Sequence, residues 1–537
     1  EKIVYSAARH LTIRPVGTAV VGFSIDLTDG SDLARQLADL NHSLLICRMV
    51  AEGSGYSDGE QHYLPVLPEQ ESVTNTLAFT QNEPGRKTID LTTLFPVKAT
   101  NKKLTVEYTS HPSWLLIQSL PSLAIPDQYN AVSLAAAYYA NGVAAYLMHR
   151  NPVLKRVVSL WKQEDAGEST LRSQLDQNPD LKNLVLNETP WVLEADRQAD
   201  QKQKLSELFD ENLVQSRRSE ALSKLLRLQT AEGAWAWCPG MQGNIYMTEA
   251  VSEMLVRLNA MTGRQQETTM MLDRAFNWMA GKMHEEVIRL KDEQNHGAKT
   301  VLPSEEAVHF LYMDAIDGRR LSAQGEADKI YLVNLIADRG TDMTIYGKAR
   351  TAVILAKNHR TGKAKEFLQS VKEYSVYREE TGRYFDTDKA RYHWCDDQIP
   401  TEVAAIEGLR CLDPASQAID EMRRWLLQEK RTTSWNTPVN AVDAVYAFGV
   451  DSMAIQKEET LPLMRVDGRA LAVSQATAGL GYVQSSVEEN HARVLTIDKT
   501  EKGISWGAVY AQFMEKGSNI QNARSGMTVT REILSPS

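Results

Sequence analysis

The sequence predicts a multidomain protein of mixed α and β class, in which a ring of paired helices, an α/α-toroid, lies between β-rich segments. Three observations lead to this prediction: strand-like alternation near the start, a series of capped helices rich in small apolar residues in the middle, and strand patterns near the end. We therefore expect a β-rich segment over residues 1–115, the helical ring over 116–450 and a further β segment over 451–537.

The first segment alternates apolar and polar residues, as a half-buried strand does. Leu104, Val106 and Tyr108 would share one face of such a strand. Thr18–Leu27 is a similar but less regular run, and the glycine-rich Gly53–Gly59 indicates a turn. The alternation predicts β-structure for this part of the chain.

The prediction of a ring depends on a repeat of helix beginnings. Five segments open with Ser or Thr, whose hydroxyl can accept a hydrogen bond from a free amide of the first turn, and continue with small, apolar residues. They begin 36 to 57 residues apart, and amphipathic helices such as Gly325–Ala337 and Ala415–Glu429 alternate with them. The five segments begin at Thr248, Ser304, Thr344, Thr401 and Thr437.

This alternation has a geometric interpretation. Small residues let helices crowd around a common axis, while amphipathic helices cover the outside. Ala131–Met148 is mostly alanine and would be another inner helix; Ser133, Asn141 and Gly142 within it make it a poor membrane span. An open superhelical array is the alternative, because periodicity alone does not show closure, but the irregular repeat length favours the ring.

Strand patterns return in the third segment. Met464–Val473 contains the dipeptide Asp467–Gly468, which is typical of a tight hairpin turn. Three further runs are expected to form strands. They are Arg493–Ile497, Ile504–Phe513 and Met527–Leu534.

Charge and composition argue against two kinds of partner. The formal net charge is −10 over 537 residues, without a run of five or six like charges, so we expect neither nucleic acid nor an anionic membrane surface as a partner. The chain opens at Glu1 without a methionine, and we expect it to be a piece of a longer protein. The cysteines form no CxxC pair and do not decide the compartment. They are Cys47, Cys238, Cys395 and Cys411.

We find no recognisable catalytic centre in the sequence. His393–Asp397 gathers several metal-ligand side chains, but they are adjacent, whereas zinc sites usually draw on separated pairs. His284 lacks the second histidine of an HExxH motif, and His309 is expected to be a packed core histidine. No GxSxG, Walker A or GxGxxG segment occurs in a strand–turn–helix context. We therefore expect no enzymatic activity, no metal and no cofactor.

Two tryptophans lie two residues apart in a loop bounded by Gly and Pro. Trp235 and Trp237 could line a sugar site or a hydrophobic pocket, but we expect them to plug the end of the ring between successive helices. Tyr129 and Tyr138 are further candidates for residues that line a pocket.

Many short motifs occur in one order from about residue 50 to the end of the chain. They include Ser57–Leu67, Leu104–Tyr108, Tyr138–Asn141, Glu188–Trp191, Gly233–Trp237 and Gly503–Tyr510. In this order they resemble the thioester-domain region of bacterial alpha-2-macroglobulin-like proteins. The resemblance implies a toroidal thioester domain inserted into a β-domain, with macroglobulin-like or CUB-like β-segments beside it.

The resemblance also implies a function. It suggests a protease trap on the periplasmic or extracellular side, anchored to the membrane through a segment that this chain does not contain. Proteases and the other domains of the same longer chain would be its partners, and this piece itself would not contact the membrane.

The sequence departs from the family at its reactive motif. The family's Cys-x-Glu-Gln motif joins the Cys sulfur to the Gln side chain in a thioester, which later captures a protease covalently. Counted back from Tyr138–Asn141, the motif falls on Asn130, Ala131, Val132 and Ser133. Asn130 stands where Cys belongs and Ser133 where Gln belongs, so a thioester cannot form. We therefore expect a trap that acts sterically and without covalent capture.

Two other functions stay open. One is an α/α-toroid that binds or cleaves glycans with Trp235, Trp237 and Asp396, which would need a second carboxylate. The other is a structural or docking subunit.

Overall fold

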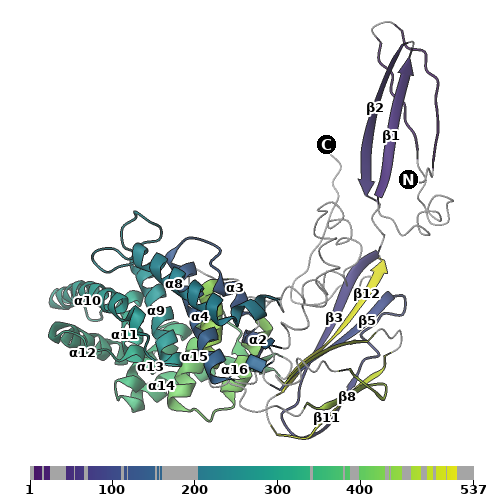
Figure 1. Cartoon of the computed structure of the whole chain (residues 1–537). Coiled ribbons are helices and arrows are strands. Elements are labelled where there is room, and N and C mark those ends of the chain that lie inside the picture. The colour runs from purple at the N-terminus through teal and green to yellow at the C-terminus, as the bar shows by residue number, and fades with distance from the viewer. Residues whose placement is uncertain are drawn as a thin grey trace.

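Figure 1 shows the computed structural model of the chain, in which helices gather in one body and most strands in another. The structure describes residues 5–14, 17–24, 44–53, 55–65, 70–110, 114–117, 119–151, 154–156, 158–159, 203–338, 343–378, 381–387, 398–429, 435, 437–449, 461–472, 481–487, 492–502 and 505–516. The predicted mixed α and β class is confirmed, whereas the exact domain boundaries at 115 and 450 stay a prediction.

Six helices contact one another in a closed cycle. They are α4 (Ala131–Arg150), α9 (Ile245–Thr262), α11 (Glu305–Asp317), α13 (Ile345–Lys357), α15 (Ile399–Leu412) and α17 (Pro438–Phe448). Each helix contacts the next one named, and α17 contacts α4. The cycle closes, as a ring does and an open superhelical array does not.

A second set of helices alternates with these inner helices along the chain and packs against them. It comprises α8 (Glu211–Leu228), α10 (Gln266–Asn295), α12 (Ala323–Ala337), α14 (Thr361–Glu373) and α16 (Ala418–Glu429). In α14 the buried residues Ala364, Phe367, Leu368 and Val371 recur every three or four positions, which is the apolar stripe of an amphipathic helix. Two short helices, α2 (Trp114–Ile117) and α3 (Leu120–Ala124), precede α4.

Helix α4 is buried in the ring. It is long and apolar enough to cross a membrane by length and composition, but 78% of its apolar window is buried inside the protein. Gly142 allows the close approach of α9, because a Cβ atom there would lie 2.9 Å from Leu258 Cδ2. The prediction that Ala131–Met148 is a closely packed helix is therefore confirmed.

Three of the predicted helix caps are confirmed. The side-chain oxygens of Ser304, Thr344 and Thr437 accept hydrogen bonds from the amide three residues further on, at 3.2, 3.1 and 3.2 Å. Each hydroxyl satisfies one of the free amides of its first turn, which is why α11, α13 and α17 begin there.

Two predicted caps are wrong. Helix α9 begins earlier than predicted, after Asn244, and Thr248 lies inside the helix, where its hydroxyl donates to the Asn244 carbonyl and accepts from the Trp235 amide. Helix α15 likewise begins after Gln398, so Thr401 lies within its first turn. In α9 the Asn244 side chain accepts from the Met247 amide, and this cap lies one turn before Thr248. In α15 the Gln398 side chain makes no cap hydrogen bond.

Strands from before and after the ring pair with each other in two four-stranded sheets. The strands are β3 (Gln70–Thr80), β4 (Gly85–Asp90), β5 (Thr100–Thr109), β8 (Leu463–Val466), β9 (Arg469–Ala470), β10 (Tyr482–Val487), β11 (Val494–Lys499) and β12 (Trp506–Lys516). One sheet has the order β10-β5-β12-β3 and the other β4-β11-β8-β9, and both contribute to one apolar cluster. The ring is therefore inserted between β5 and β8 of a β-sandwich.

Of the strands predicted in the first segment, one is confirmed and one is wrong over its described part. Leu104, Val106 and Tyr108 are buried in this cluster, as their shared face predicted. Residues 18–24 of the run Thr18–Leu27 form no strand, so that prediction is wrong over the part that is described. Alternation alone was insufficient there, because a strand also needs a partner for its hydrogen bonds.

The predicted strands of the third segment largely appear. Asp467 and Gly468 form the turn between β8 and β9, both with positive φ, as a two-residue hairpin turn requires. Arg493–Ile497 and Ile504–Phe513 correspond to β11 and β12, whereas Met527–Leu534 lies outside the described residues.

Two separate hairpins complete the fold. In the first, β1 (Leu44–Gly53) pairs with β2 (Tyr56–Pro65), so the turn predicted over Gly53–Gly59 is confined to its first residues. In the second, β6 (Ser375–Arg378) pairs with β7 (Gly382–Phe385) between α14 and α15.

Candidate functional site

The start of α4 is closed by its own side chains. The Asn130 side-chain oxygen accepts a hydrogen bond from the Ser133 amide at 2.9 Å, and its side-chain nitrogen donates to Gln128 at 3.1 Å. The Ser133 hydroxyl donates to the Asp127 carboxylate at 3.0 Å. Asn130 is therefore a helix cap, and Ser133 ties the first turn to the preceding loop.

Asn130 and Ser133 thus hold the first turn of α4 in place through their hydrogen bonds. That these two residues stand at the family's thioester positions stays a prediction. Cys47, Cys238 and Cys411 are free thiols, but they lie on β1, in the loop before α9 and on α15. Each of these segments is distinct from the start of α4.

A pocket of about 180 Å³ lies beside this helix start. Its walls come from α3 and the segment that joins it to α4, from the first turns of α4, and from the start of α17 with Trp435 before it. The volume is enough for several water molecules or one small side chain. The pocket is lined by Ser122, Leu123, Ile125, Pro126, Asp127, Ser133, Ala136, Trp435, Thr437, Pro438 and Ala441.

The two tryptophans predicted to line a pocket lie in different environments. Trp235 is 0% exposed, and its indole nitrogen donates to the Leu225 carbonyl at 3.1 Å. Trp237 is 52% exposed. Trp235 is thus buried in the helical core and Trp237 faces solvent, and a plug at the end of the ring stays a prediction.

Of the two candidate tyrosines, Tyr138 lies on α4 and Tyr129 lies just before it. Tyr129 is 43% exposed, with the Lys224 ammonium 5.9 Å from its ring centre. Tyr138 is buried, and its hydroxyl accepts a hydrogen bond from Arg218 at 3.2 Å. Neither tyrosine, and neither tryptophan, is among the residues that line the pocket beside Ser133, so their pocket-lining role stays a prediction.

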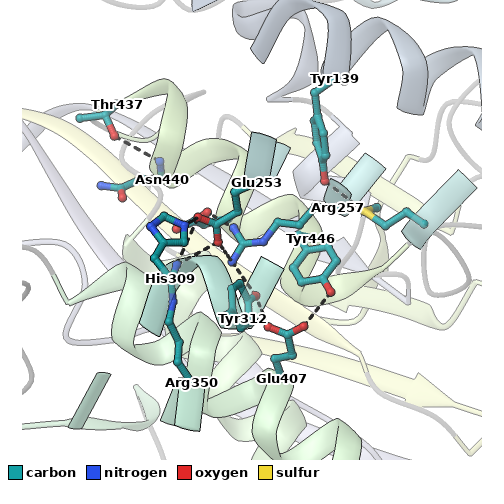
Figure 2. Close-up of polar contacts among 12 residues, drawn as sticks. Tyr139, Glu253, Arg257, His309, Tyr312, Arg350, Glu407, Thr437, Asn440 and Tyr446 are labelled. Atoms are coloured by element: carbon teal, nitrogen blue, oxygen red, sulfur yellow. Dashed lines mark hydrogen bonds and ion pairs between the residues drawn. The ribbon is translucent and has the colours of Figure 1, made fainter. Parts of the chain in front are cut away.

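A network of charged side chains occupies the centre of the ring (Figure 2). Glu253 on α9 pairs with Arg257 at 2.7 Å and with Arg350 on α13 at 2.9 Å. The second guanidinium nitrogen of Arg257 pairs with Asp443 on α17. Glu407 on α15 accepts hydrogen bonds from the hydroxyls of two buried tyrosines, Tyr312 and Tyr446. We call these residues, with Glu249 and His309, the ring-centre network.

The sequence predicted that His309 packs in an apolar core, but the structure places it between two carboxylates. Its Nε2 lies 2.7 Å from Glu253 and its Nδ1 lies 3.3 Å from Glu249. Its side chain is 15% exposed. Two glutamates one turn apart on α9 face His309 on α11, and the sequence of α11 alone does not reveal these partners.

Burial and charge pull the carboxyl groups of the network in different directions. Burial would raise the pKa of Glu253, but Arg257 and Arg350 outweigh it and hold the pKa of Glu253 well below its ordinary value. Burial raises the pKa of Asp443 to about 6 in spite of Arg257. Burial also raises the pKa of Glu249, which has no guanidinium in direct contact among the described ion pairs. The network cross-links inner helices by charge.

The sequence carried one weak signal of this network. Glu249, Glu253 and Arg257 recur every four residues on α9, so three ionisable groups share the inner face of an otherwise apolar helix. Their partners lie on other helices, up to 186 residues away along the chain.

Within the described residues, no group of three His, Cys, Asp or Glu side chains could hold a metal ion. The candidate segment His393–Asp397, which includes Cys395 and Asp396, lies outside these residues. His284 lies on α10, where its Nδ1 is 2.9 Å from Asp328 on α12.

Comparison with known proteins gives structural relatives only. No protein-family model matches the sequence. None of the curated proteins matches it either.

Three solved structures illustrate the likeness. Native Escherichia coli alpha-2-macroglobulin is 10% identical over 87% of this chain and 24% of its own length, with a TM-score of 0.43. The E. coli structure from domain MG7 to the C-terminus is 12% identical over 85% of this chain and 59% of its own, with a TM-score of 0.44. Salmonella alpha-2-macroglobulin reacted with methylamine is 11% identical over 85% of this chain and 25% of its own, with a TM-score of 0.42.

The chain therefore spans about a quarter of two of these proteins and 59% of the third. TM-scores in this range do not place individual residues of this chain on residues of those proteins. The solved structures that this chain resembles, at low identity, are bacterial alpha-2-macroglobulins.

Proposed function

We propose that this chain is the helical ring and adjoining β-sandwich of an alpha-2-macroglobulin-like protease trap that has no thioester and acts without covalent capture. Proteases would be its targets, and the rest of a longer chain would supply the segment that a protease cleaves. The proposal includes a periplasmic or cell-surface location, with anchoring through a segment that this chain does not contain.

The observation that carries this proposal is the hydrogen bonding at the start of α4. The Asn130 side chain caps the helix at the Ser133 amide, and the Ser133 hydroxyl bonds Asp127. Both side chains at the position of the family's reactive pair are thus engaged in closing a helix. No electrophile is stored there, so what remains for the ring to contribute is its shape.

The topology gives independent support. The ordered sequence motifs imply a toroid inserted into a β-domain, and the described strands on either side of the ring pair with each other across the insertion. Helix α4, which carries the altered motif at its start, is an inner helix of the closed cycle.

The first test concerns the missing thioester. The full chain is incubated with methylamine and its intact mass is measured; we expect no change, because no acyl group is available to the amine. Salmonella alpha-2-macroglobulin, whose reaction with methylamine gave a solved structure, is the positive control. A mass increase localised to residues 127–133 would contradict the proposal.

The second test concerns steric trapping. The full-length protein, which contains this chain and the segment that a protease cleaves, is mixed with a serine protease, and hydrolysis of a large protein substrate is compared with that of a short peptide substrate. A steric trap slows the first reaction and spares the second, because the enclosed active site still admits a peptide. Equal inhibition of both would indicate an active-site inhibitor, and no effect on either would favour a structural or docking subunit.

A further inference from the structure

His309 lies between two carboxylates of a neighbouring helix. Glu249 and Glu253 are one turn apart on α9, and their Oε2 atoms lie 3.3 Å from Nδ1 and 2.7 Å from Nε2 of the imidazole. A neutral imidazole has one N–H donor, whereas the protonated ring has two. Contacts to a carboxylate at both nitrogens are therefore satisfied together only when His309 carries a proton on each.

The two carboxylates do not depend on His309 equally. Glu253 also pairs with Arg257 and Arg350, so it keeps two cationic partners when His309 is neutral. Glu249 is buried, and its other oxygen, Oε1, has no hydrogen-bond partner in the described structure. Glu306 on α11 adds a second negative charge near Glu249. Loss of the His309 proton would thus leave Glu249 buried without a cation in contact.

We propose that His309 is a proton-operated latch of the ring: the protonated imidazole ties α11 to α9, and release of its proton as the pH rises loosens this contact. The groups that face His309 are Glu249 and Glu253 from α9 and Arg350 from α13. Because α9 and α11 are consecutive members of the closed cycle, loosening this contact weakens the ring between them.

The electrostatics agree with the geometry. Burial and Arg350 favour the neutral imidazole, but Glu249 and Glu253 outweigh them and raise the pKa of His309 above its ordinary value of 6.5. A histidine whose folded-state pKa is raised contributes its full stabilisation below about pH 6.5 and loses it as the pH rises through the folded-state pKa. The latch is therefore closed below about pH 6.5 and opens as the pH rises through the folded-state pKa of His309.

The test is hydrogen exchange of the α9 and α11 amides in the full chain between about pH 5 and 9, corrected for the intrinsic exchange rate. We expect local opening to increase between about pH 6.5 and the His309 midpoint, by up to about tenfold per pH unit, the limit for release of one proton, and to level off above that midpoint. His309→Gln keeps hydrogen-bonding groups but does not titrate, and it should abolish this increase. His284→Gln, at a histidine that contacts a single carboxylate between α10 and α12, should behave as the wild type does.

A second measurement covers the case in which His309→Gln does not fold. The His309 imidazole is titrated by NMR in the wild-type chain and in Glu249→Gln, whose side chain has the same shape and no charge. We expect a wild-type midpoint above 6.5 and a lower midpoint in the variant. A wild-type midpoint at or below 6.5, or an opening that rises with pH in His309→Gln as in the wild type, would overturn the proposal.

Discussion

The side-chain oxygen of Asn130 lies 2.9 Å from the backbone nitrogen of Ser133, so Asn130 acts as the cap of α4. The same first turn is tied to the preceding loop through Ser133 and Asp127. This relationship explains why the helix begins where it does without any covalent bond between the side chains of its first turn.

The first prediction concerns the contribution of the Asn130 cap to stability. Asn130→Ala removes the acceptor for the Ser133 amide, and we expect it to lower the free energy of unfolding by about 0.5–2 kcal/mol. Asn130→Asp retains a cap oxygen and should cost much less. Urea unfolding of the three chains measures the difference. If Asn130→Ala and Asn130→Asp unfolded at the same urea concentration, the cap would contribute nothing to stability.

The second prediction concerns the ring-centre network. Arg257→Met leaves Glu253 and Asp443 buried without their shared cation, and we expect a loss of about 3–5 kcal/mol in the free energy of unfolding. Arg289→Met is the matched control, because Arg289 is half exposed beside two glutamates on α10 and its removal should cost less than about 1 kcal/mol. Similar losses in the two variants would show that the network does not hold the ring together.

The third prediction is a pH dependence at Glu402. Burial raises the pKa of Glu402 well above its ordinary value, and neither carboxyl oxygen has a hydrogen-bond partner in the described part of the chain. The folded state therefore holds this proton at pH values where the unfolded state releases it, so stability is lost as the pH rises above about 4.5.

Glu402→Gln removes this titration without changing the shape of the side chain. We expect the variant to gain stability relative to the wild type as the pH rises from about 4.5, by at most about 1.4 kcal/mol per pH unit. Thermal unfolding at several pH values measures this difference. Glu285→Gln, on the exposed face of α10, is the matched control for the same change of side chain outside the core.

The fourth prediction separates the two tryptophans. Trp235→Ala removes a fully buried indole and should cost about 3–5 kcal/mol in the free energy of unfolding, whereas Trp237→Ala should change it by less than about 0.5 kcal/mol. Denaturant unfolding checks both. Binding of the chain to a glycan array that is lost in Trp237→Ala would instead favour the glycan-binding function.

The sequence by itself determined the class of the fold and much of its local structure. Caps at Ser304, Thr344 and Thr437 and the turn at Asp467–Gly468 were predictable, because a hydroxyl near a free amide and a residue tolerant of positive φ act within a few residues. That Asn130 and Ser133 stand at the positions of the family's reactive pair stays a prediction from the sequence motifs. Thr248 and Thr401 were predicted to precede their helices, but α9 begins after Asn244 and α15 after Gln398, about one turn earlier.

Only the tertiary structure decided what occupies the centre of the ring. Arg257 pairs with Asp443, which is 186 residues away, and Arg350 pairs with Glu253, which is 97 residues away. Such partners meet because six helices close into a cycle, and their rotation about the ring axis depends on packing that no single helix encodes. For the same reason the sequence placed His309 in an apolar core, and only the closed ring brought Glu249 and Glu253 to its two nitrogens.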